Sequence, residues 1–172
     1  KNFASSSWVT NEAFQLKDGG FLLTQLSMPA RIPGVSNSLW FLKPIGPPKY
    51  FEVIELDSKM VHPRGLAEAD FDGDGKMDVA VAGHGADLPP FPGEKLVLLK
   101  NKENILQPWP EELSQEAVFS FAVAAADIAG DLDQDIFLNA TAGSRAFFLV
   151  NQGGGKFKKR LADEIYQKNP SC

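Results

Sequence analysis

Residues 70–78 read Asp70-Phe71-Asp72-Gly73-Asp74-Gly75-Lys76-Met77-Asp78. Positions 1, 3 and 5 of this segment are carboxylates, and a tight loop makes such side chains converge on one point. Position 7 can add a neutral backbone oxygen, position 9 closes the far side, and the two glycines permit the positive φ that a tight turn needs. The sequence therefore predicts a metal site with the ligands Asp70, Asp72, Asp74, Lys76 (backbone carbonyl) and Asp78.

The donor atoms of this loop are all oxygens, which suits a hard cation. Several carboxylates with carbonyls and water favour calcium, because magnesium prefers fewer protein ligands and strict octahedral geometry. Without a cation, the carboxylates would repel one another by roughly 1 kcal/mol per close pair even in a water-like dielectric. Ca²⁺ is therefore the expected cofactor, and an acidic turn that binds nothing is the alternative.

An EF-hand shares the first ligand positions of this loop. It also requires a bidentate glutamate at position 12 and a helix on each side. Position 12 here is Val81, and both flanks are typical of strands. The EF-hand is therefore excluded.

The segment recurs in a weaker form 57 positions further along the chain, where Asp127 corresponds to Asp70. In the second copy Ala129 replaces the ligand at position 3, and Leu132 replaces a turn glycine. We expect this loop to bind metal weakly or not at all. Its candidate ligands are Asp127, Asp131, Asp133 (backbone carbonyl) and Asp135.

The same step of 57 residues, counted from Asp70 toward the N-terminus, defines a third unit. It places Ala13, Gln15, Lys17 and Phe21 at the ligand positions, so no metal is expected there. The predicted organisation is one propeller domain of three units. These are residues 1–60 without a metal loop, 61–117 with the calcium loop and 118–172 with the degenerate loop.

Each unit reads as short strands, because apolar runs are bounded by Gly, Pro and Asn and no helical periodicity persists. Strands are expected at 21–26, 38–43, 50–56, 77–82, 95–100, 119–126, 135–140, 146–151 and 156–161, with a short helix at 111–115. The predicted class is all-β, with about three four-stranded antiparallel blades. Propellers close with roughly four to eight blades, so we expect a fragment of a larger ring.

The loop motif, followed by residues 79–85 and by Pro89-Pro90-Phe91-Pro92-Gly93, resembles the FG-GAP or VCBS repeat. Residues 147–157 look most like the secreted bacterial members of that family. The clear match covers about residues 61–161, and the first 60 residues fit only by register. The resemblance implies a propeller, usually seven-bladed, with calcium in the loop between the first two strands of some blades. It also implies an extracellular or cell-surface role in adhesion or carbohydrate binding.

The net charge and the distribution of apolar residues limit the kinds of partner to expect. A formal net charge of −5 argues against nucleic acid, and the absence of a run of about 18 apolar residues argues against membrane insertion. The expected partners are a glycan or an extracellular protein, with further blades from the parent chain or from another subunit. The single cysteine, Cys172, is the last residue, which excludes an internal disulfide and leaves its role open.

Three functions are compatible with these features of the sequence. The first is a calcium-stabilised binding module, which needs no catalytic group, and the second is a structural spacer within a large secreted protein. The third is an enzyme resembling the polysaccharide lyases, which would need a cluster such as His62, Arg64, His84 and Asp87. The binding module is preferred, so the chain is expected not to be an enzyme.

Overall fold

The computed structural model describes residues 8–27, 36–46, 50–110, 113 and 116–162, without the side chains of 8–12 and 25–27. All regular elements of these residues are β-strands, and no helix that could span a membrane occurs among them. Cys172 and all but one residue of the expected helix at 111–115 lie outside the described residues. The strands are β1 (Trp8–Gln15), β2 (Phe21–Ser27), β3 (Asn37–Pro44), β4 (Phe51–Met60), β5 (Pro63–Ala69), β6 (Asp78–Gly83), β7 (Val97–Lys102), β8 (Ile105–Pro108), β9 (Val123–Ala126), β10 (Asp135–Leu138), β11 (Phe147–Asn151) and β12 (Phe157–Leu161).

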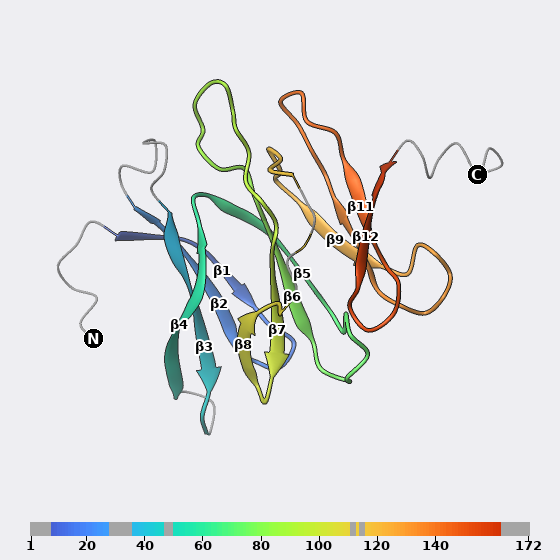
Figure 1. Cartoon of the computed structure of the whole chain (residues 1–172). Helices are drawn as coiled ribbons and strands as arrows, with labels where there is room; N and C mark the ends of the chain where they lie inside the picture. The colour runs from blue at the N-terminus through green and yellow to red at the C-terminus, as the bar shows by residue number, and fades with distance from the viewer. Residues whose placement is uncertain (1–7, 28–35, 47–49, 111–112, 114–115, 163–172) are drawn as a thin grey trace.

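The strands form three four-stranded sheets, each built from four consecutive strands (Figure 1). The first sheet has the order β1-β2-β3-β4, the second β5-β6-β7-β8, and the third β9-β10-β11-β12. Chain neighbours within each sheet pair antiparallel, as short hairpin connections require. The predicted all-β class with three antiparallel blades is confirmed. Within the described residues the sheets do not close into a ring, as expected for part of a propeller.

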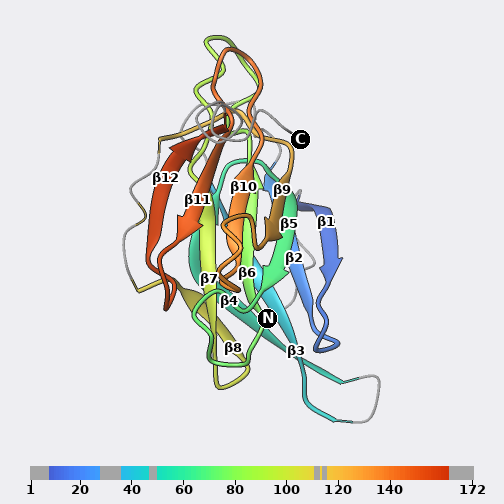
Figure 2. The ribbon, with the colours of Figure 1, turned by 90° about the vertical axis from the view of Figure 1, so that its right-hand side faces the viewer.

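The second sheet lies between the other two (Figures 1 and 2). Its strand β6 is buried along its whole length, and successive side chains of a strand point to opposite faces. Val79 and Val81 join the core against the first sheet, while Ala80 and Ala82 join the core against the third. A continuous apolar run at residues 79–82 is therefore the consequence of burial on both faces.

Three observed strands, β1, β5 and β8, were missing from the expected set. All three are edge strands, which pair on one side only. Strand β5 opens with Pro63 and contains Gly65, both poor strand formers. The expected strand at 119–126 is also shorter, because β9 begins at Val123 and Phe119 makes only an isolated bridge to Thr141.

The first turn of the first unit differs from what the 57-residue step between units predicted. The second strands keep the 57-residue step, since Phe21, Asp78 and Asp135 begin β2, β6 and β10. The connection before β2 spans residues 16–20, however, whereas the other two span 70–77 and 127–134. The placement of Ala13 and Gln15 at ligand positions was therefore wrong, because both residues lie within β1. The first sheet has a turn three residues shorter than the acidic loops.

Candidate metal centre

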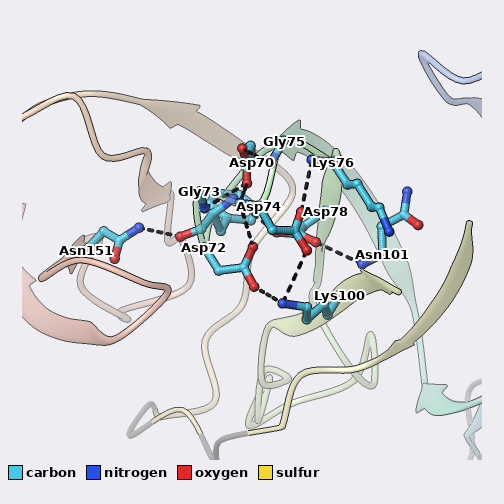
Figure 3. Close-up of polar contacts among 11 residues, drawn as sticks. Asp70, Asp72, Gly73, Asp74, Gly75, Lys76, Asp78, Lys100, Asn101 and Asn151 are labelled. Carbon is cyan, nitrogen blue, oxygen red and sulfur yellow. Dashed lines mark hydrogen bonds and ion pairs between the residues drawn. The ribbon is translucent and has the colours of Figure 1, made fainter. Parts of the chain in front are cut away.

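The acidic loop connects β5 to β6 at one end of the second sheet. Asp70 follows the last residue of β5, and Asp78 is the first residue of β6. The hairpin pairs Ala69 with Asp78, so the two ends of the loop lie side by side. Figure 3 shows the aspartate side chains of this loop gathered on one side, with Lys100 directed at them.

Asp70 fixes the conformation of the loop through its own carboxylate. Its Oδ1 accepts hydrogen bonds from the backbone N–H groups of Gly73 (2.8 Å) and Asp74 (3.0 Å), and its Oδ2 accepts one from Gly75 (2.8 Å). Gly73 and Gly75 have φ values of 77° and 86°, a region that strains residues with a Cβ. The glycines of the motif are therefore required by the backbone.

Three carboxylates of the loop come together. One oxygen each of Asp70, Asp72 and Asp78 lie within 4.8 Å of one another, the one such group in the described residues. Asp78 is fully buried, and it accepts hydrogen bonds from the N–H groups of Phe71 (3.0 Å) and Asn101 (2.8 Å). Burial, together with the negative charges of Asp74 and Asp70, raises the pKa of Asp78 to about 6.

Asp74 stands outside this group of three carboxylates. The Asp74 carboxylate accepts the N–H of Lys76 (3.0 Å) and lies 3.5 Å from the ammonium of Lys100. That ammonium also forms an ion pair with Asp72. Sequence reasoning missed Lys100 as a neighbour of the loop, because its place on β7 is set by the pairing of β6 with β7. The loop thus holds a cationic side chain between two of its carboxylates.

The second loop, residues 127–134, has the same internal hydrogen bonds. Asp127 accepts the N–H groups of Gly130, Asp131 and Leu132 at 2.7–3.1 Å. Leu132 takes a φ of 74° with a side chain that is 90% exposed, so the strained conformation is kept without glycine. The described carboxylates of this loop do not gather in a group of three, because Ala129 offers none at position 3.

Asn151 joins the acidic loop to the third sheet (Figure 3). Its buried Nδ2 donates to the carbonyl of Phe71 at 2.7 Å and to that of Gln134 at 3.2 Å. The matching residue of the second sheet is Asn101, because each donates its N–H at 2.8 Å to the aspartate that begins the second strand. The buried Oδ1 of Asn101 finds no hydrogen-bond partner among the described residues. The Asn151 side chain therefore links the acidic loop of the second sheet to the third sheet.

The residues considered for an enzyme lie at the opposite end of the second sheet, where β5 begins and β6 ends. The rings of His62 and His84 have centroids 4.1 Å apart, and Nε of Arg64 donates to Nε2 of His84 at 3.0 Å. Both imidazoles are buried. Burial lowers the pKa of His62 to about 4, with further lowering by His84 and Arg64, and it also lowers the pKa of His84.

Acidification from about pH 7 to about pH 4.5 is expected to destabilise the wild-type protein more than a His62→Gln variant. The pKa of His62 is 6.5 in the unfolded chain but about 4 in the folded protein. The stabilising contribution of neutral His62 is therefore lost as the pH falls from about 6.5 to about 4. The raised pKa of Asp78 acts with the opposite sign but is common to both proteins. Melting temperatures measured against pH test this, and parallel curves for the two proteins would contradict it.

The comparisons with known proteins concern the middle of the chain. A family model described as the FG-GAP-like repeat matches residues 70–138. No curated protein and no solved structure matches the chain. The matched segment begins at the first ligand position of the acidic loop and ends with β10, so it includes both loops. Residues 70–138 are therefore similar to the FG-GAP-like repeat, and this similarity suggests a β-propeller-type module.

Proposed function

We propose that residues 70–78 bind one calcium ion, and that the chain is an extracellular or cell-surface β-propeller module that binds a glycan or another protein in adhesion. The observation that carries the proposal is the group formed by Asp70, Asp72 and Asp78, whose oxygens lie within 4.8 Å of one another. Its oxygen ligands suit calcium, which takes about six to eight of them in flexible geometry.

The surroundings of the loop support a cation. The Asp70 carboxylate and the loop glycines form the turn through hydrogen bonds within the chain, so the carboxylates are gathered before an ion arrives. The raised pKa of Asp78 has the sign expected of a buried carboxylate among like charges. Asp74 and the carbonyl of Lys76 are further ligands in the proposal, once the Lys100 ammonium leaves Asp72 and Asp74.

The proposed role of the ion is to stiffen the contact between blades. The loop that would hold it carries Phe71, whose carbonyl accepts the Asn151 side chain of the third sheet. A bound ion would neutralise the carboxylates and hold this loop against its neighbour. The connecting loops could then present a rigid surface, and the proposal requires no catalytic residue.

Further blades are part of the proposal, from the parent chain or from another subunit. Phe71 of the first acidic loop is 1% exposed beneath the third sheet, whereas Ile128 at the matching position of the second loop is 37% exposed. Phe51 and Val53 of β4 are 36% and 45% exposed. Apolar side chains on both outer sheets would be covered if the ring continued.

Calcium at 100 times its dissociation constant is expected to stabilise the wild-type protein by about 2.7 kcal/mol, or a rise in melting temperature of roughly 5–10 °C. Asp72→Ala should remove this rise, because it deletes one of the three converging carboxylates. Calorimetric titration of the chelated protein and melting curves with and without calcium measure the two effects.

The second loop supplies the controls for that experiment. Ala129 occupies its third position and the loop still forms, so Asp72→Ala should fold. Asp131→Ala should keep the calcium response, and the double variant Ala129→Asp with Leu132→Gly should acquire a second calcium site. A wild-type protein that neither releases heat nor gains stability with calcium would overturn the proposal. A glycan array then separates a binding module from a structural spacer, since a spacer would bind nothing on it.

A further inference from the structure

Arg64 lies at the start of β5, at the end of the second sheet away from the acidic loop, and belongs to a cluster of side chains there. It is the bulged residue of β5, between Pro63, which pairs with Gly83, and Gly65, which pairs with Ala82. Its guanidinium donates through Nε to the imidazole of His84 at 3.0 Å. The cluster therefore arises where β5, the end of β6 and the following loop meet.

The hydrogen bonds of His84 set the orientation of Arg64. The Nε2 atom accepts from Arg64, so the proton of the neutral ring is on Nδ1, which donates to the carbonyl of Gly85 at 3.0 Å. The ring is 1% exposed, stacked on Phe119 with centroids 4.7 Å apart. Because the imidazole is held on one face by Phe119 and beside the ring of His62 at 4.1 Å, the guanidinium is held in turn.

The charge of Arg64 is not neutralised by this arrangement. Its partner is a neutral imidazole, and no carboxylate of the described residues lies within 4 Å of the guanidinium. Asp87 is exposed and acts on the histidines only at a distance. Glu94 is directed elsewhere, because it accepts the N–H groups of Val61 and His62. Arg64 is half-buried, and among the described residues the hydrogen bond of its guanidinium is the one from Nε to His84. An arginine fork that is not paired with a carboxylate is suited to receive one.

Close backbone packing makes the cluster rigid. A Cβ at Gly85, whose φ is 68°, would lie 2.2 Å from the carbonyl oxygen of Gly93, and a Cβ at Gly93 would lie 2.4 Å from the backbone of Val118. The N–H of Ser120 donates to the carbonyl of Gly83 at 3.2 Å. The segment that carries Phe119 is therefore fixed over the end of β6.

Exposed apolar groups border the cluster. Phe121 is 46% exposed, with its ring centroid 5.1 Å from that of His84. Phe91 is 38% exposed and makes an edge contact with Phe119. An exposed aromatic ring packed against the same histidine that holds the guanidinium suits a ligand that carries its carboxylate on a ring with an apolar C–H face.

We propose that Arg64, positioned by His84, forms with the neighbouring Phe121 of the same cluster a binding site for an acidic sugar that presents its carboxylate to the guanidinium. The inference rests on the proposed role as a binding module, but not on the calcium loop. It gives that module a ligand class, a sugar carboxylate, and a location at the opposite end of the sheet. His84 is a positioning residue here, since it touches Arg64 and not the ligand.

The test is a titration of the whole chain with glucuronate, and with glucose as the neutral control. Calorimetry measures the heat of binding, and ¹⁵N-resolved NMR measures the shifts of the backbone amide signals and of the Arg64 Nε–H signal. Glucuronate should bind and glucose should not. Arg64→Gln should weaken glucuronate binding by about 10- to 100-fold, as expected when a charged hydrogen-bond donor is lost. Arg64→Lys should restore little of it, because lysine keeps the charge but not the fork.

Two substitutions of His84 distinguish a role in positioning Arg64 from a role in core packing alone. His84→Gln keeps an acceptor for the Arg64 Nε–H and should retain most of the binding, whereas His84→Leu should lose it. If His84→Leu fails to fold, the comparison of Arg64→Gln with Arg64→Lys still decides. Binding of glucose as well as glucuronate, binding of inorganic phosphate alone, or unchanged affinity in Arg64→Gln would overturn the proposal.

The same samples distinguish this inference from the calcium proposal. Asp72→Ala should bind glucuronate like the wild type, and Arg64→Gln should keep the calcium-dependent rise in melting temperature. Loss of the calcium response with intact glucuronate binding would overturn only the metal site. The reverse result would overturn only the carboxylate site.

Discussion

Replacing Phe71 by alanine is expected to destabilise the protein by about 3–5 kcal/mol, the range for loss of a large aromatic side chain from a core. Phe71 is 1% exposed and belongs to the core between the second and third sheets. Its ring meets that of Phe157 in an edge contact with centroids 5.9 Å apart. The cavity would open at the place where the acidic loop contacts the third sheet.

Urea unfolding with and without calcium measures the effect. Ile128→Ala is the matched control, because Ile128 occupies the same position of the second loop and is 37% exposed. We expect that variant to lose less than about 1 kcal/mol, as is usual for partly exposed positions. Equal losses in the two variants would show that the third sheet does not cover Phe71 in solution.

Replacing Asp135 by alanine is expected to cost about 3 kcal/mol or more, because three buried or half-buried N–H groups would lose their acceptor. Asp135 is fully buried. It accepts from Ile128 (2.8 Å) and Ala129 (3.1 Å) on Oδ2, and from Asn151 (2.8 Å) on Oδ1. One carboxylate therefore ties the second loop to both β10 and β11.

The destabilisation by Asp135→Ala should be the same with calcium and with chelator, because its loop gathers no group of three carboxylates. Asp131→Ala serves as the control, since the exposed Asp131 accepts, among the residues that the structure describes, only the N–H of Asp133, at 3.2 Å. Its cost should stay below about 1 kcal/mol. A calcium-dependent effect at Asp135 would mean that the second loop also binds the ion.

The local structure of the acidic loops followed from sequence because its determinants lie within nine residues. Asp70 and Asp127 accept hydrogen bonds from residues three to five positions ahead of them. The glycine positions agree with the positive φ values at Gly73 and Gly75. Such short-range bonds depend on spacing alone, so a repeated spacing predicts a repeated loop.

Contacts between strands were predicted less completely. The shorter turn of the first sheet was missed because a fixed step of 57 residues cannot reveal a deletion compensated elsewhere. Half of the six edge strands in the described residues, β1, β5 and β8, were missed. Strand β5 escaped notice because an edge position tolerates Pro63 and Gly65, which are poor strand formers. The positions of these three strands became visible only through the partners to which they are hydrogen-bonded.

The sequence by itself determined the all-β class, the repeated acidic loop and its candidate ligands Asp70, Asp72 and Asp78, because periodicity and loop spacing are local properties. Only the tertiary structure placed Lys100 against the loop and joined Arg64 to His84 across 20 positions of the chain. It also brought Asn151 to Phe71 across 80 positions. Contacts of that range depend on how strands pair and how sheets stack, and burial decides there which polar groups meet.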